Sequence, residues 1–149
     1  ASLWNEYIAI CLLMNSNNFT TCADSYLRNV DQLISLIEAG NASAVVGGVY
    51  PHNSYNAAGA QALHYTHTTL AARAPHYVNF LNATADGEGR WREGLWADPG
   101  HPNDAGHAAM FGAIDLSLFE RFGCTPHPPS SPPSPPRPPP PSPPPPSPS

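Results

Sequence analysis

Proline dominates the last part of the chain and limits what can fold there. Sixteen of its 20 prolines lie between Pro126 and Pro148. Because proline fixes φ and has no backbone N–H, this segment cannot join a hydrogen-bonded core and is expected to form a polyproline II helix. The sequence therefore predicts two parts, a globular domain over 1–124 and a proline-rich tail over 125–149.

The charges of the chain argue against nucleic acid as a partner. Six basic residues, none of them lysine, face eleven acidic ones, which gives a net charge of -5. Binding to phosphates needs a basic patch, and the sequence shows none. No apolar run approaches the ~20 residues that cross a bilayer. We therefore expect neither a nucleic-acid partner nor a membrane span.

Glycosylation and cysteine signals point to a secreted protein. Three Asn-x-Ser/Thr sequons predict N-glycans on Asn18, Asn41 and Asn82. Cys11 and Cys22 flank a polar loop and are expected to form a disulfide, which leaves Cys124 over. We expect Cys124 to pair outside this chain, although a free buried thiol is the alternative. The extracellular matrix or cell wall is the expected location.

Hydrophobic periodicity predicts helices alternating with strands. The expected helices cover 24–39, 56–74 and 103–122, and Asn103 or Asp104 is expected to cap the last of them. The expected strands cover 43–50 and 76–81, and a further strand or strand end is expected between Leu3 and Ile10. A long loop is expected over 83–100. This alternation is typical of an α/β domain with a parallel sheet and flanking helices.

Two complete strands are too few for a parallel sheet that is buried on both faces. We therefore expect about half of a doubly wound domain to lie upstream of Ala1. The edge of the first strand would be exposed near residues 1–8, so another segment or subunit is expected to cover it. A homo-oligomer or a filament is a possible arrangement.

The stretch "LWADPGHPNDAGH" over 95–107 holds the strongest candidate for chemistry. A tight turn at Pro99 and Gly100 can bring the carboxylate of Asp98 to one imidazole nitrogen of His101. The other nitrogen then faces outward as a general base, which is two-thirds of a nucleophile–His–Asp triad. The alternative is a capped helix start with a surface histidine.

The segment "DGEGRWREGLWADPGHPNDAGHAAMFGAI" resembles the final conserved block of the SGNH hydrolases, or GDSL-type esterases. In addition, "VVGGVYPHNSYN" is similar to the family's central strand and the turn after it, and "SLWNE" to its oxyanion-hole segment. The resemblance covers about residues 2–122. It implies part of a flavodoxin-like parallel sheet and a serine esterase that needs no metal or organic cofactor.

Under this resemblance, His101 is the general base, Asp98 orients it, and Asn5 donates to the oxyanion. The chain departs from the family at Leu3 and Glu6, where the family usually has glycine and aspartate. The larger departure is the absence of any Gly-Asp-Ser block, which carries the family's nucleophile. The resemblance thus implies ester hydrolysis only if a serine-bearing N-terminal half is supplied.

The tail motif "SPPPPS" over 142–147 is similar to repeats of hydroxyproline-rich wall glycoproteins of plants and green algae. This similarity implies glycans on tail proline and serine residues; a bare spacer is the alternative. It also supports a rival hypothesis, a catalytically inactive structural subunit of an extracellular filament or cell wall.

Other clusters carry weaker signals. Three histidines, His64, His67 and His76, could bind a metal, but they are better explained as polar residues on a helix surface. Two tryptophans, Trp91 and Trp96, could line a groove, stack on sugar or pack the long loop.

Overall fold

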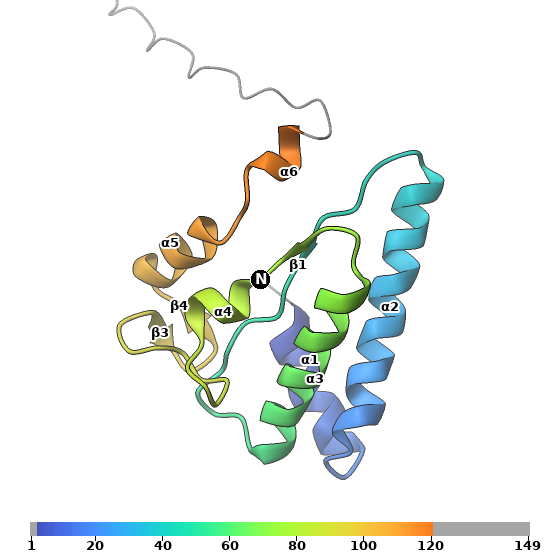
Figure 1. Cartoon of the computed structure of the whole chain (residues 1–149). Helices are drawn as coiled ribbons and strands as arrows, with labels where there is room; N and C mark the ends of the chain where they lie inside the picture. The colour runs from blue at the N-terminus through green and yellow to red at the C-terminus, as the bar shows by residue number, and fades with distance from the viewer. Residues whose placement is uncertain (1–2, 121–149) are drawn as a thin grey trace, which may run out of the picture.

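The computed structural model describes residues 3–120, which form a mixed α/β structure of helices and two small sheets (Figure 1). The elements, in chain order, are α1 (Leu3–Met14), α2 (Phe19–Ala39), β1 (Val46–Gly47), α3 (Ala57–Arg73), β2 (Tyr77–Val78), α4 (Phe80–Thr84), β3 (Trp96–Asp98), β4 (His101–Pro102), α5 (Asp104–Gly112) and α6 (Ser117–Glu120). The expectation of an α/β domain is confirmed at this level, but no flavodoxin-like sheet is present in the described part.

The first segment is a helix, so the expected strand between Leu3 and Ile10 is wrong. Trp4, Ile8 and Leu12 are buried at a spacing of four residues, which is the period of one helix face. Because the segment is apolar on almost every side, its sequence shows no clear helical spacing of apolar and polar residues. Because residues 3–8 are helical, the expected strand edge there is also wrong, whereas the further segment or subunit expected to cover this region stays a prediction.

Three helices, α1, α2 and α3, pack side by side and hold most of the core (Figure 1). Leu27 on α2 and Leu63 and Leu70 on α3 are buried in the same core cluster as the apolar side chains of α1. Burial of each such side chain stabilises the fold by roughly 1.5–3 kcal/mol. This core fixes α1, and with it any side chain that α1 presents to the rest of the molecule.

A disulfide joins Cys11 of α1 to Cys22 of α2, with 5.7 Å between their Cα atoms. The α2 helix begins at Phe19, five residues before the expected start at Asp24. Its cap is Asn18, whose side chain accepts a hydrogen bond from the backbone N–H of Thr21. This capping by asparagine is a common way to begin a helix.

The two parallel strands are far shorter than expected. Val46 pairs with Tyr77 and Gly47 with Val78, so the strands predicted over 43–50 and 76–81 shrink to two residues each. Asn79 ends β2, because its side chain caps α4 by accepting from the N–H of Asn82 at 2.9 Å. The parallel orientation agrees with the expectation, whereas the strand lengths do not.

The helix expected over 103–122 is broken. Asn103 caps α5, but the helix ends at Gly112. A new turn begins at Ser117, whose backbone N–H bonds the side chain of Asp115 at 3.0 Å. The side chain of Asp115 thus accepts a backbone hydrogen bond that a continuous helix would give to a carbonyl oxygen, as aspartate often does before a helix start.

Cys124, the domain boundary at 124 and the proline-rich tail over 125–149 lie outside the described residues. Within 3–120, no helix is both long enough and apolar enough to cross a membrane.

Candidate functional site

The turn from Asp98 to His101 connects β3 to β4 and brings two candidate residues together. The two strands pair antiparallel, with Asp98 opposite His101 and Trp96 opposite Pro102. Asp98 Oδ1 accepts a hydrogen bond from the backbone N–H of Gly100 at 2.9 Å. This bond closes the turn, as expected for a sequence that contains Pro-Gly.

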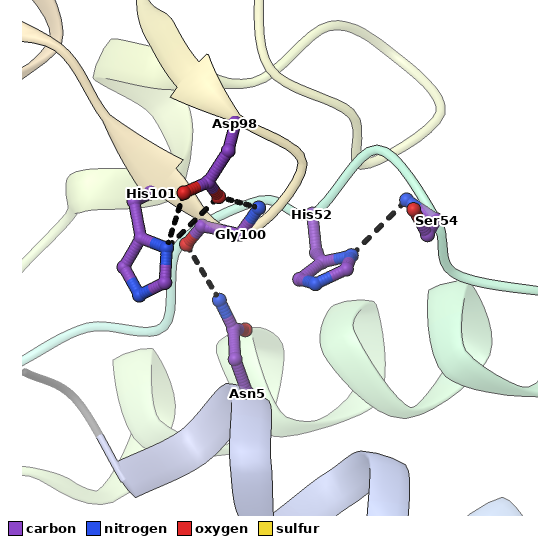
Figure 2. Close-up of polar contacts among 6 residues, drawn as sticks. All are labelled: Asn5, His52, Ser54, Asp98, Gly100 and His101. Atoms are coloured by element: carbon purple, nitrogen blue, oxygen red, sulfur yellow. Dashed lines mark hydrogen bonds and ion pairs between the residues drawn. The ribbon is translucent and has the colours of Figure 1, made fainter.

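His101 Nδ1 lies 2.8 Å from Asp98 Oδ1 and 3.0 Å from its Oδ2 (Figure 2). Because an ionised carboxylate can only accept, Nδ1 carries the proton and Nε2 of the neutral ring is the acceptor. The imidazole therefore presents a basic nitrogen away from the carboxylate. This is the arrangement of a general base and the group that orients it.

The electrostatics of the turn keep Asp98 ionised. The N–H of Gly100 and, after it, the hydrogen bond from His101 lower the pKa of Asp98. More than half of each side chain is exposed, 58% for His101 and 55% for Asp98. At such exposure the ion pair contributes little to stability, so orientation of the imidazole is its main effect.

Asn5 reaches the same turn from α1, although 95 positions separate it from Gly100. Its Nδ2 donates to the carbonyl oxygen of Gly100 at 3.3 Å (Figure 2). Its Oδ1 accepts from the hydroxyl of Tyr55 at 2.6 Å. Because the phenol donates to one end of the amide, the N–H₂ end must face the turn. Asn5 is only 7% exposed, which adds to this restraint.

A cavity of about 180 Å³ lies where these groups meet. It is lined by Asn5, Ala9, His52, Gly100 and His101. Sequence analysis missed His52 and also Tyr55, which supports Asn5. Both follow β1 in the chain, and the carboxyl ends of parallel strands are where α/β folds commonly place ligands. That position was the one signal that could have found them.

Backbone and amide contacts fasten the segment after β1 to the Asp98–His101 turn. The N–H of Asn53 donates to the carbonyl of Pro99 at 2.9 Å. The side-chain oxygen of Asn53 accepts from the N–H of Trp91, also at 2.9 Å. These bonds tie the segment after β1 to the Asp98–His101 turn and to the loop that contains Trp91.

The start of α5 is bonded to the loop that precedes the β3–β4 hairpin. Its cap, Asn103, donates from Nδ2 to the carbonyl of Gly94 at 2.8 Å, while its Oδ1 accepts from the N–H of Gly106 at 3.0 Å. One side chain therefore ties the helix start to the loop before β3.

The two tryptophans have different surroundings. Trp91 is buried and its ring lies 5.7 Å from that of Tyr50, so it packs the long loop. Trp96 is substantially exposed on β3. Neither lines the cavity beside His101, so the structure gives no support to a groove made by both rings.

The histidine group does not assemble into a metal site. His67 Nδ1 lies 2.8 Å from the hydroxyl of Tyr77, and burial lowers the pKa of His67. Within residues 3–120, no three His, Cys, Asp or Glu side chains are grouped to hold a metal ion.

The three sequon asparagines, Asn18, Asn41 and Asn82, are all exposed. Each side chain is thus sterically open to a glycan. No serine from the described part of the chain lines the cavity at His101. The imidazole of His101, the carboxylate of Asp98 and the amide of Asn5 are therefore close together, and no serine of residues 3–120 lines the cavity with them.

No protein-family model matches this chain, and no curated protein matches it either.

Proposed function

We propose that this chain supplies the base and oxyanion half of an SGNH-type, or GDSL-type, serine esterase. The observation that carries the proposal is that His101, which is bonded to Asp98, and Asn5 line one small cavity. Asp98 bonds Nδ1 of His101, and Asn5 arrives from a helix 95 positions away to face the same turn. A capped helix start with a surface histidine would not require that long-range contact.

Each residue has a defined part in ester hydrolysis. Nε2 of His101 takes the proton of an attacking serine hydroxyl, and the carboxylate of Asp98 stabilises the imidazolium that forms. The hydrogen of Asn5 Nδ2 that does not bond Gly100 donates to the oxyanion of the tetrahedral intermediate. Hydrolysis of the acyl-enzyme then returns the proton through the same imidazole. This chemistry needs neither a metal nor an organic cofactor.

The nucleophile must come from a further segment, since the sequence holds no Gly-Asp-Ser block. The parallel pair of β1 and β2 supports this part of the proposal. An isolated two-stranded sheet is marginal, and parallel pairs usually belong to larger sheets. We infer that a serine-bearing N-terminal half adds strands to this pair and completes a flavodoxin-like sheet.

We also propose that the protein is secreted and acts in an extracellular matrix or cell wall. Three exposed sequons, a disulfide and a Ser-Pro tail support this location. Glycans on the asparagines and on tail proline and serine residues belong to the same proposal. Esters of wall polysaccharides are the substrate class that such a location favours.

Fluorophosphonate labelling of the native material, followed by mass spectrometry of the labelled peptides, tests the proposal. We expect the label on a serine in a Gly-Asp-Ser peptide. His101→Ala should abolish labelling because the serine loses its base. His107→Ala is the matched control, since His107 is exposed on α5 and does not line the cavity. Native material without any labelled serine would contradict the esterase proposal.

The second candidate function is a structural subunit of an extracellular filament or wall, without catalysis. Apolar side chains at the surface of α2 favour it: Leu33, Leu36 and Ile37. Such a face is typical of a surface that a partner covers. If the native material takes no label but assembles as its concentration rises, and Leu36→Gln prevents that assembly in analytical ultracentrifugation, the structural function is favoured.

A further inference from the structure

One face of α1 leads away from the candidate site. Asn5, Ala9 and Leu13 are spaced four residues apart, so their side chains point to the same side of the helix. The amide of Asn5 donates to the carbonyl of Gly100, which shows that this side faces the Asp98–His101 turn (Figure 2). Ala9 and Leu13 are both exposed, so the face is open beyond Asn5.

Two hollows adjoin along this face, and Ala9 lines both of them. The first is the cavity of about 180 Å³ beside His101. The second has a volume of about 220 Å³ and lies between Ala9, Leu12 and Leu13 on one side and residues 54–56 on the other. Because the side chain of Ala9 is a single methyl group, little separates the two hollows. We call the two together the α1 groove.

Hydrogen bonds fasten the wall of the groove that lies opposite α1. At the end near the turn, the hydroxyl of Tyr55 donates to Asn5 Oδ1 at 2.6 Å. At the far end, Nδ2 of Asn56 donates to Oδ1 of Asn17, three residues after α1, at 3.2 Å. Between Asn5 and Leu13, α1 rises by about 12 Å at ~1.5 Å per residue. The groove therefore has two tied walls and a length set by two turns of helix.

The α1 side of the groove offers hydrocarbon to a ligand. Ala9, Leu12 and Leu13 present only apolar side chains there. Among the described residues that line either hollow, none is Asp, Glu, Lys or Arg, so a charged group would find no ionic partner along the groove. Both ends of the Asn56 amide are already bonded, to Asn17 and to the N–H of Gly59. An apolar chain laid along α1 would gain free energy because both surfaces leave water.

We propose that the α1 groove holds the acyl chain of the ester substrate, with the reacting carbonyl beside Asn5 and His101. This inference rests on the proposed esterase function and deepens it by naming the acyl group, an aliphatic chain of medium length such as octanoyl. An extended octanoyl chain fits within the rise of about 12 Å between Asn5 and Leu13. Ala9 is then a specificity-determining residue, because a larger side chain there would divide the groove.

Binding of octanamide to the full chain tests the groove without any nucleophile. This probe has a neutral carbonyl and the chain of the proposed acyl group. We expect it to shift the methyl signals of Ala9 and Leu13 in ¹³C NMR. It should bind at least about tenfold more tightly than butanamide, because each methylene removed from water improves binding by up to about fourfold. Ala9→Trp should weaken octanamide binding by about tenfold, since the indole takes the place of the chain.

Ile10→Trp is the matched control, the same substitution at the next residue of α1. Ile10 is 59% exposed and lines neither hollow, so this variant should bind octanamide as wild type does. Leu13→Gln should weaken binding by about threefold, because it removes apolar contact from the groove. Leu13 is 84% exposed, so the far-ultraviolet circular dichroism spectrum should not change.

Three results of the binding experiment would overturn the groove as an acyl site. They are the absence of shifts at Ala9 and Leu13, equal binding by Ala9→Trp and Ile10→Trp, and wild-type binding by Leu13→Gln.

Hydrolysis of p-nitrophenyl octanoate and p-nitrophenyl acetate by the native material separates this inference from the esterase proposal. Ala9→Trp should lower the ratio of kcat/KM for octanoate to that for acetate by about tenfold, chiefly through a higher KM for octanoate. Ile10→Trp should keep the wild-type ratio. Octanamide binding in the groove without wild-type hydrolysis of either ester would overturn the esterase proposal alone. Hydrolysis of both esters with an unchanged ratio in Ala9→Trp would overturn the acyl groove alone.

Discussion

Asp98 is held in its ionised form by two donors of different origin, a backbone N–H and an imidazole. The N–H of Gly100 is the larger cause of the lowered pKa of Asp98, and the His101 hydrogen bond comes second. A carboxyl whose pKa is lower in the folded than in the unfolded chain stabilises the fold above its unfolded pKa. That stabilisation is lost as the pH falls through the folded pKa.

Titration of the Asp98 carboxyl carbon by ¹³C NMR checks this prediction. We expect a midpoint below that of an aspartate in an unstructured peptide. His101→Ala should raise the Asp98 midpoint only in part, because the Gly100 N–H remains. A midpoint that returns fully to the ordinary aspartate range in His101→Ala would contradict the dominance of the backbone donor.

Tyr55 acts on the site through Asn5. Its hydroxyl donates to the buried Oδ1 of Asn5 at 2.6 Å. Tyr55→Phe removes that donor from a buried oxygen, so we expect the free energy of unfolding to fall by about 1–3 kcal/mol. Urea denaturation measures the change. The loss should be accompanied by weaker ester hydrolysis in the native material, because the Asn5 amide then loses its hydrogen bond from Tyr55 and keeps the one to Gly100.

Tyr65→Phe is the matched control for that variant. Tyr65 also donates from its hydroxyl, to Asp24 at 2.8 Å, but at the surface. We expect the control to change the free energy of unfolding by less than about 1 kcal/mol. Equal losses in the two variants would show that the Asn5 contact has no special importance.

Residue spacing predicted the partnership of Asp98 and His101 because a tight turn is a local structure. Pro99 and Gly100 are typical turn residues, so the sequence alone indicates this turn. His52 and Tyr55 could not be found in this way. Their positions, His52 beside Gly100 at the cavity and Tyr55 against Asn5, are created only by the tertiary fold.

Among the elements, α5 depends on one close approach to the hairpin. A Cβ atom at Gly106 would meet the carbonyl oxygen of Leu95 and lie 2.7 Å from Cβ of Pro102. Gly106→Ala should therefore displace the helix and lower the free energy of unfolding by about 1–3 kcal/mol, or more, as overpacking does. Thermal and urea denaturation measure this loss.

Gly112→Ala provides the control on the same helix. A Cβ atom at Gly112 would meet nothing within 4 Å. Because alanine favours helix more than glycine, this variant should be neutral or stabilising by up to about 1 kcal/mol. If Gly106→Ala were as stable as Gly112→Ala, the proposed contact between α5 and the hairpin would not exist.

Helices with a polar face were the elements that sequence predicted best. The expected helix over 56–74 corresponds to α3, and the one over 24–39 is most of α2. By contrast, α1 is apolar on almost every side, and short apolar segments do not distinguish a helix from a strand. The break between α5 and α6 was missed because Asp115 was not recognised as a local cap.

At the scale of the whole molecule, the Cys11–Cys22 disulfide ties α1 to the longest helix. A cross-link over 11 positions restricts the unfolded chain and should stabilise the fold by about 3 kcal/mol. We expect the double variant Cys11→Ala, Cys22→Ala to lose about that amount in urea denaturation. Reduction of the wild type should give a similar loss, and a larger loss in the variant alone would implicate packing at Cys22.

The global topology was predictable only in part. The alternation of helices and apolar runs indicated an α/β arrangement with parallel pairing, and β1 and β2 do pair in parallel. Strand length could not be read from the apolar runs, because Asn79 redirects the chain into α4 immediately after Val78. Local capping thus overrides a pattern that by itself favours an extended strand.

The contact between Asn5 and Gly100 joins α1, the first described helix, to the β3–β4 hairpin. On the ribosome, α1, α2 and α3 can emerge and begin to pack long before residues 98–101 have been synthesised. Contacts of such long sequence separation form late, because loop closure must precede them. A nascent chain stopped before the hairpin would hold a helical core with its disulfide, yet it would lack the pairing of Asp98 with His101.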